Sequence, residues 1–151
     1  MLGTENPIRV VVVGSDSLTT EHLQTILDPQ KFVVEAIEPT PKEIANVRKS
    51  NPDLFVVDDP DGVAGLQTVC QTIRQYSCMP ILVLSSFRNP NVITQVLDAG
   101  ADDFLSKPVT GSVLMAHLNT LARRALAERD AALAIVRGEN TPKQTLGLLI
   151  Y

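Results

Sequence analysis

Five short apolar runs, separated by stretches with helical periodicity, constrain the fold of this chain more than any other feature. Short runs rich in β-branched side chains are typical of strands that are buried on both faces. Strands that alternate with helices are joined by right-handed crossovers and form a parallel sheet covered by helices. The sequence therefore predicts an α/β fold, a doubly wound five-stranded parallel sheet with helices on both faces. The runs are IRVVVV (8–13), FVVEAI (32–37), LFVVD (54–58), PILVL (80–84) and DFL (103–105).

The stretches between these runs carry helix signals. Ser17 is placed to cap a helix after the first run, and residues 40–43 (TPKE) form a capping box with Pro at the first helical position. Gly100 is expected to end the fourth helix, and a last helix is expected to begin near Ser112. Apolar residues at helical spacing predict the buried faces: Leu18, Leu23, Ile26, Leu27, Ile44, Val47, Leu66, Val69, Ile73, Val92, Ile93, Val96 and Leu97.

Composition excludes several classes of function. The chain has 151 residues, a one-domain length, with a net charge of −4, no Trp and 4% aromatic residues. An excess of acidic residues and few aromatic rings argue against a nucleic-acid site on this domain. No stretch approaches the roughly 20 apolar residues that cross a bilayer, and the N-terminus lacks the pattern of a signal peptide. We therefore expect no contact with a membrane and a cytoplasmic location.

Polar side chains follow several of the predicted strands. A carboxylate, Asp58, ends the third run, a hydroxyl, Ser85, follows the fourth, and an ammonium, Lys107, follows the fifth. In open parallel sheets the ligand crevice lies at the carboxyl ends of the strands. We therefore expect a carboxylate, a hydroxyl and an ammonium to meet at one edge of the sheet.

Three longer motifs make the chain similar to a known family. They are PDLFVVD (52–58), PILVLSS (80–86) and AGADDFLSKPV (99–109). With the order of all elements, they resemble the receiver domain of two-component response regulators over about residues 7–126. The resemblance implies a flavodoxin-like fold with strand order 2-1-3-4-5. It also implies a signalling module rather than an enzyme.

The resemblance assigns a role to each polar residue at the predicted edge. Asp58 would accept a phosphoryl group from a histidine kinase, Ser85 would contact the phosphoryl oxygens, and Lys107 would pair with their charge. Phe104, three residues before Lys107, falls at the position of the family's switch aromatic. Phosphoryl transfer depends on positioning and charge neutralisation, so a magnesium ion held by carboxylates is implied as well. Alternatively, Lys107 forms a salt bridge to Asp58 that stabilises the crevice.

The chain departs from the family pattern where the magnesium ion would bind. Receivers carry an acidic pair after the first strand, and Gly14 and Ser15 occupy those positions here. Besides Asp58, the replacement ligands are Asp16, one residue later, or Asp59 or Asp61 in the DPDG turn (59–62). Magnesium binding is therefore expected to be weak.

This departure favours one function over another. The favoured function is an atypical receiver, or pseudo-receiver, that regulates through protein–protein interaction with weak or no magnesium-dependent phosphorylation. The alternative is a phosphate-accepting receiver in which a histidine kinase phosphorylates Asp58. A third, from another class, is a flavodoxin-like enzyme or cofactor binder. The chain argues against the third, because it has no Gly/Ser/Thr-rich phosphate loop after the first strand.

Beyond the predicted receiver, residues 127–138 predict a helical extension that Gly138 ends. Residues 139–151 are expected to be a linker or the start of a missing output domain. The partners implied are a histidine kinase and an output domain or protein. The extension either forms a homodimer through a weak heptad seam or is a solvated helix. The seam consists of Leu114, Leu118, Leu121, Ala125, Ala132 and Ile135.

Overall fold

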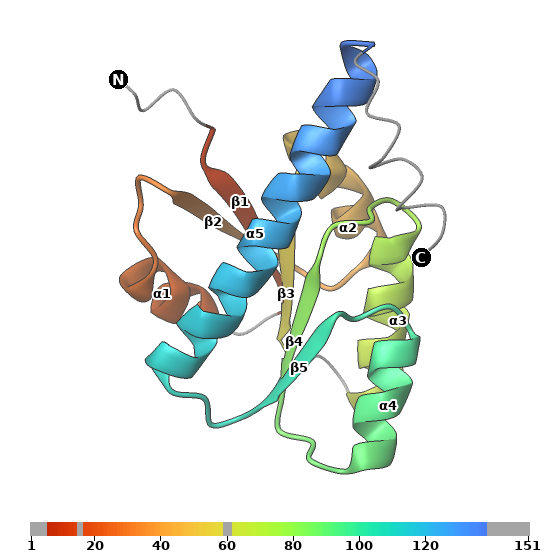
Figure 1. The fold of residues 1–151 in the computed structure, drawn as a ribbon. Helices are drawn as coiled ribbons and strands as arrows, with labels where there is room; N and C mark the ends of the chain where they lie inside the picture. The colour runs from red at the N-terminus through yellow and green to blue at the C-terminus, as the bar shows by residue number, and fades with distance from the viewer. Residues whose placement is uncertain (1–5, 15–16, 59–61, 139–151) are drawn as a thin grey trace.

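The computed structural model describes residues 6–14, 17–58 and 62–138. In this part of the chain, five strands form one parallel sheet in the order β2-β1-β3-β4-β5 (Figure 1). This confirms the predicted fold class and strand order. The strands are β1 (Ile8–Val13), β2 (Phe32–Ile37), β3 (Leu54–Asp58), β4 (Ile81–Ser85) and β5 (Asp103–Ser106).

Helices cover both faces of the sheet, as predicted. Helices α1 and α5 pack on one face, and α2, α3 and α4 pack on the other (Figure 1). No helix in the described part of the chain is long and apolar enough to cross a membrane. The helices are α1 (Ser17–Ile26), α2 (Pro41–Val47), α3 (Gly62–Arg74), α4 (Pro90–Asp98) and α5 (Gly111–Val136), with a short 3-10 helix, η2 (Arg48–Ser50), after α2.

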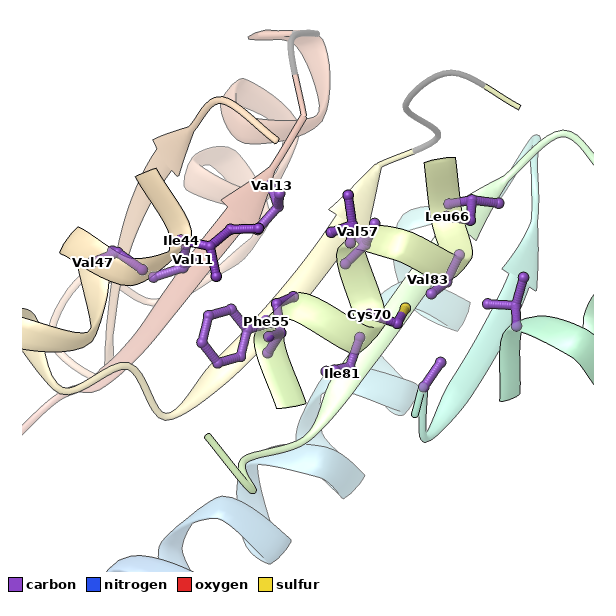
Figure 2. Packing of buried hydrophobic residues seen from close by; sticks show 14 residues of the cluster. Val11, Val13, Ile44, Val47, Phe55, Val57, Leu66, Cys70, Ile81 and Val83 are labelled. Carbon is purple, nitrogen blue, oxygen red and sulfur yellow. The ribbon is translucent and has the colours of Figure 1, made fainter. Parts of the chain in front are cut away.

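Alternation along the central strands divides the core into two layers. Successive side chains of a strand point to opposite faces, so Val11 and Val13 of β1 face α2 and α3, whereas Val10 and Val12 face α1 and α5. Figure 2 shows the first of these layers, in which Cys70 of α3 lies among the strand residues. A sheet buried on both faces places its polar chemistry at the strand ends, because its faces are occupied by apolar side chains.

Local signals place the helices as expected. The Thr40 side chain accepts a hydrogen bond of 3.2 Å from the Glu43 backbone N–H, and Pro41 occupies the first turn of α2. Gly100 follows α4 with a φ of +128°, a conformation that favours glycine, and an added Cβ would lie 2.8 Å from Arg74 Cγ. The helix start after Thr40 and the helix stop at Gly100 are therefore confirmed.

Some residues predicted to be buried are not. Leu18 is 68% exposed and Leu97 is 38% exposed, while Val92 and Ile93 are only partly buried. Helix α4 lies beside β5, the last strand of the sheet, and Val96 is its one fully buried residue. The helical period is confirmed, but α4, at the edge of the sheet, buries fewer residues than its apolar stripe suggests.

The predicted heptad seam is divided between two environments. Its first four members, Leu114, Leu118, Leu121 and Ala125, are buried, whereas Ala132 and Ile135 are exposed. Helix α5 therefore uses the first half of this stripe to pack on its own sheet, and those residues are not available to a second copy. The helix continues without a break to Val136.

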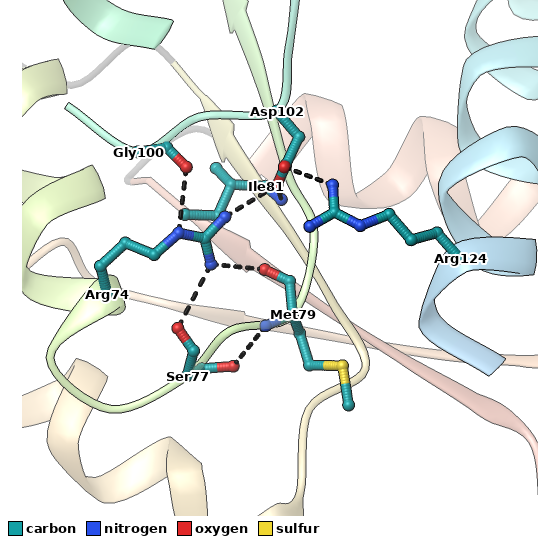
Figure 3. Close-up of polar contacts among 7 residues, drawn as sticks. All are labelled: Arg74, Ser77, Met79, Ile81, Gly100, Asp102 and Arg124. Carbon is teal, nitrogen blue, oxygen red and sulfur yellow. Dashed lines mark hydrogen bonds and ion pairs between the residues drawn. The ribbon is translucent and has the colours of Figure 1, made fainter. Parts of the chain in front are cut away.

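Asp102 ties three elements, α3, β4 and α5, together at the amino end of β4. The Arg74 guanidinium donates to Asp102 at 2.7 Å, to the Met79 carbonyl at 2.6 Å and to the Gly100 carbonyl at 3.0 Å (Figure 3). The Ile81 backbone N–H also donates to Asp102 at 2.8 Å, and Arg124 of α5 forms an ion pair with its other oxygen (Figure 3). This network fixes α3 and α5 against the start of β4.

Arg129 attaches the second half of α5 to the same edge of the sheet. It forms an ion pair with Asp53, which is only 5% exposed, and donates to the carbonyls of Asn6 at 3.1 Å and Pro7 at 3.3 Å. The Arg9 backbone N–H donates to Asp53 at 2.8 Å. These contacts of Arg129 hold the extension of α5 at the amino edge of the sheet. The polar residues that follow the strands lie at the opposite, carboxyl edge.

Candidate functional site

Asp58 ends β3 at the carboxyl edge of the sheet. It pairs in register with Leu84 of β4, and the residue is only 3% exposed. Such a position between central strands removes the carboxylate from water, and a buried carboxylate needs a cation or hydrogen-bond donors. The contacts of its two oxygens therefore decide what the site can do.

Lys107 supplies a cation to Asp58. Its Nζ forms an ion pair with Asp58 Oδ1, and the side chains of Lys107 and Asp58 are 34% and 1% exposed. Oδ1 has no hydrogen-bond partner of good geometry, so the contact is one of charge. The expected salt bridge is present, and the predicted ammonium and carboxylate meet at one edge.

Thr19 was not anticipated from the sequence. Its hydroxyl donates a 2.7 Å hydrogen bond to Asp58 Oδ2 across 39 positions of the chain. The two oxygens of one carboxylate are thus engaged by different elements, Oδ2 by α1 and Oδ1 by the residue after β5. The one signal available beforehand was that a helix following the first strand begins at this edge of the sheet.

Ser85 is fully buried at the end of β4 and anchors the adjacent loops. Its Oγ accepts a hydrogen bond of 3.2 Å from the Phe87 backbone N–H, and its carbonyl accepts one of 2.8 Å from the Lys107 backbone N–H. Ser106 Oγ donates to the Phe87 carbonyl at 3.0 Å. These bonds tie the loop after β4 to the end of β5 and hold the backbone of Lys107 beside Ser85.

Phe104 lies on β5, paired in register with Val83 of β4. Its ring is partly buried and packs against the core layer formed with α3 and α4. The structure brings Asp58, Lys107 and the end of β4 together, and it places Phe104 in the strand that leads to Lys107. The roles assigned to Ser85 and Phe104 stay predictions.

Most of the magnesium ligands expected from the sequence lie outside the part of the chain that the structure describes. Asp16, Asp59 and Asp61 lie outside the described residues. Among the residues that are described, no group of three His, Cys, Asp or Glu side chains is placed to hold a metal ion. Of the magnesium ligands expected from the sequence, Asp58 alone lies in the described part of the chain.

Gly14 shows why a side chain is not easily accommodated at the first position of the expected acidic pair. A Cβ added there would lie 2.8 Å from the Asp58 carbonyl oxygen and 3.2 Å from Asp58 Cβ. Real Cβ atoms do not approach a backbone oxygen so closely, so β1 and β3 would have to separate. The backbone at Gly14 therefore runs too close to that of Asp58 to accept a side chain without a shift.

Known proteins resemble this chain in sequence and in fold. The chain matches the profile of the family described as "Response regulator receiver domain" over residues 10–119. It is 34% identical over 119 residues to the two-component response regulator PhoP of Pseudomonas aeruginosa, covering 78% of this chain and 53% of PhoP. It is 31% identical over 119 residues to the transcriptional regulatory protein CseB of Streptomyces coelicolor, covering 76% of this chain and 49% of CseB. The chain spans about half the length of these relatives.

Solved structures resemble this one in fold. A response regulator from Thermotoga maritima superposes with a TM-score of 0.69 at 23% identity, covering 78% of this chain and 99% of that chain. A two-component response regulator from Clostridium difficile superposes with a TM-score of 0.66 at 22% identity, covering 78% of this chain and 97% of that chain. At this identity the likeness concerns the fold alone, whereas the profile match covers most of the sequence. The chain belongs to the response regulator receiver family.

Proposed function

We propose that this chain is a phosphate-accepting receiver domain in which Asp58 takes a phosphoryl group from a histidine kinase. The observation that carries the proposal is the buried Asp58 carboxylate, whose Oδ1 faces Lys107 and has no hydrogen bond of its own. A carboxylate oxygen held beside a cation is suited to attack phosphorus, because the cation offsets the charge of the incoming phosphoryl group. Relatives such as PhoP, named as two-component response regulators, support this function over the phosphorylation-independent module.

The reaction is a single displacement at phosphorus. Asp58 Oδ1 forms a bond to the phosphorus atom, the bond from phosphorus to the kinase histidine nitrogen breaks, and its electron pair stays on that nitrogen. The product is an acyl phosphate. Because the transition state spreads charge over the phosphoryl oxygens, the Lys107 ammonium stabilises it by charge. The chain acts as the acceptor in a signalling reaction and not as a classical enzyme.

The partners of the domain follow from this function. A histidine kinase donates the phosphoryl group, and an output domain or protein responds to it. Because the chain spans about half the length of its relatives, the output is sought in sequence outside this chain. Self-association through α5 and a cytoplasmic location stay predictions.

One observation favours the second candidate, the pseudo-receiver that acts through its surfaces. A Cβ at Gly14 would lie 2.8 Å from the Asp58 carbonyl oxygen, so the backbone would have to shift to accept the first carboxylate of the expected acidic pair. Without that ligand, magnesium binding would depend on residues outside the described part of the chain. The two candidates therefore differ in one measurable property, the ability of Asp58 to be phosphorylated.

The test is intact-mass spectrometry after incubation with acetyl phosphate and millimolar magnesium, with Asp58→Asn as the matched control. The proposal predicts the added mass of one phosphoryl group on the natural chain and none on the variant. If a phosphorylated histidine kinase also leaves the natural chain unmodified, the proposal is wrong and the pseudo-receiver stands. Equal modification of both chains would place the phosphoryl group elsewhere.

A further inference from the structure

The hydrogen bond from Thr19 distinguishes the two oxygens of Asp58. Thr19 Oγ1 donates to Oδ2 at 2.7 Å, whereas Oδ1 faces Lys107 without a hydrogen bond. Under the proposed function, Oδ1 attacks phosphorus and Oδ2 becomes the carbonyl oxygen of the acyl phosphate. The Thr19 hydroxyl therefore donates to the Asp58 oxygen that does not bond phosphorus. The negative charge on this oxygen decreases when the acyl phosphate forms.

Other threonines in the helices use their hydroxyls differently. Thr25, Thr72, Thr94 and Thr120 each donate to the backbone carbonyl four residues before them. This is the usual local bond of a helical threonine. Thr19 lies in the first turn of α1, which begins at Ser17, so it has no helical carbonyl four residues back. Its hydroxyl is directed at Asp58 instead.

A hydrogen bond to a charged oxygen is stronger than one to a neutral carbonyl. The Thr19 hydroxyl therefore stabilises the Asp58 carboxylate more than it stabilises the acyl phosphate. When water attacks phosphorus, the bond between phosphorus and Oδ1 breaks with its electron pair on Asp58. A proton of the water passes to solvent, and inorganic phosphate is released. Negative charge returns to the Asp58 carboxylate during this step. The Thr19 hydroxyl already donates a hydrogen bond to that carboxylate.

We propose that Thr19 is a positioning residue that shortens the lifetime of the phosphoryl group on Asp58. The inference rests on the proposed function, because it requires that Asp58 be phosphorylated. Thr19 fixes the carboxylate with Oδ1 toward Lys107 and stabilises the carboxylate as it leaves phosphorus. Removing its hydroxyl makes the carboxylate a poorer leaving group and lengthens the lifetime.

The test measures loss of the phosphoryl group from four chains: the natural one, Thr19→Val, Thr19→Ser and Thr25→Val. Each is phosphorylated with labelled acetyl phosphate, the donor is removed by rapid desalting, and the label is followed over time. We expect Thr19→Val to lose the label about threefold to tenfold more slowly, since one hydrogen bond to a charged group is lost. Thr19→Ser keeps the hydroxyl and is expected to decay like the natural chain. Thr25→Val removes an exposed hydroxyl of the same helix and is the matched control.

The outcomes separate this inference from the proposed function. If the natural chain takes no label from acetyl phosphate or from a phosphorylated histidine kinase, the proposed function fails and the inference fails with it. If the natural chain is labelled and Thr19→Val decays at the natural rate, only the inference is overturned. Slow decay in Thr19→Ser or Thr25→Val would also overturn it, because the effect would then not come from this hydroxyl. Thr19→Ala replaces Thr19→Val if circular dichroism shows that the valine variant does not fold.

Discussion

At the scale of single residues, the two side chains of the ion pair in the crevice differ in their exposure to solvent. The Asp58 side chain is 1% exposed and the Lys107 side chain is 34% exposed. A partly exposed ammonium finds water when its partner is removed, whereas a buried carboxylate does not. The two ends of the pair should therefore respond differently to substitution, although they share one contact.

We predict that Lys107→Gln lowers the free energy of unfolding by about 1–3 kcal/mol, because it leaves a buried charge without its cation. The value is below that of a fully buried pair, since Lys107 is partly exposed to solvent. Asp58→Asn is expected to change stability by less than Lys107→Gln, and the double variant should recover most of the loss. Urea unfolding measures all three. Equal destabilisation by the two single substitutions would contradict this view of the site.

The end of β1 leaves little space for a side chain at Gly14. Gly14→Ala should lower the free energy of unfolding by about 1–3 kcal/mol, because its Cβ would meet the Asp58 carbonyl oxygen at 2.8 Å. Gly111→Ala is the matched control, since its Cβ would come no closer than 3.7 Å to His22 and alanine favours the helix. Thermal unfolding of both variants tests the contact. A Gly14→Ala variant as stable as the natural chain would mean that β1 and β3 separate easily at this edge.

The sequence located some residues of the site and could not locate others. Asp58, Ser85 and Lys107 follow apolar runs directly, and the geometry of parallel strands brings such positions together. Thr19 lies in the first turn of α1, and nothing local in the sequence indicates which group its hydroxyl bonds. Only the packing of α1 against the strand ends shows that its hydroxyl reaches Asp58.

At the scale of elements, the stripe on α5 shows what periodicity leaves open. The spacing of Leu114, Leu118 and Leu121 predicted an apolar face, and the face exists. Periodicity does not specify which surface covers that face, and here it is the sheet of the same chain. Beyond Ala125 the helix depends on a different contact, the ion pair between Arg129 and Asp53.

We predict that Arg129→Ala lowers the free energy of unfolding by about 2 kcal/mol and speeds amide hydrogen exchange in residues 127–136. The substitution removes the cation of Asp53, which is 5% exposed, and frees two carbonyls near the start of β1. Arg123→Ala is the matched control, because Arg123 is an exposed residue of the same helix. Unchanged exchange in Arg129→Ala would show that the helix end is held by other contacts.

The two cysteines lie in opposite environments. Cys70 is buried in α3 and Cys78 is exposed, and burial raises the pKa of the Cys70 thiol to about 11 from 9.0. A raised pKa stabilises the protonated, folded form below about pH 9, and this stability is lost as the pH rises toward 11. We predict that the free energy of unfolding falls less steeply over this interval in Cys70→Ala than in Cys78→Ala. Identical slopes in urea unfolding at several pH values would contradict the buried position.

At the scale of the whole molecule, chemistry and extension lie at opposite edges. Asp58 ends β3 at the carboxyl edge, whereas α5 runs past the amino edge (Figure 1). The exposed apolar residues of its last turns are Leu133, Ile135 and Val136. Self-association through α5 would use these residues, because the earlier members of the stripe are buried in the core.

We predict that the chain sediments as a dimer and that the double substitution Ile135→Asp and Val136→Asp makes it a monomer. Two carboxylates would replace apolar side chains that are 77% and 82% exposed, so the fold itself should not change. Leu18→Asp, at a residue 68% exposed on α1, is the matched control. Analytical ultracentrifugation gives the masses. Equal masses for all three chains would exclude the extension as the dimer element.

Most of the fold was predictable because the apolar runs, the helical spacing and the capping residues indicate the same elements. The three central apolar runs match β1, β3 and β4 closely, and capping residues mark α2 and α4. What the sequence leaves open depends on contacts between distant residues, such as Thr19 with Asp58 and Arg129 with Asp53. Such contacts have no local period, so they become visible only once the elements are assembled.

An NMR titration with magnesium, followed by beryllium fluoride as a mimic of the aspartyl phosphate, tests directly whether Asp58 accepts a phosphoryl group. The proposed function predicts amide shifts that cluster around Asp58, Ser85 and Lys107 when the mimic is added. Asp58→Asn should show none of these shifts. An unchanged spectrum of the natural chain at millimolar magnesium and beryllium fluoride would contradict the claim that Asp58 accepts a phosphoryl group.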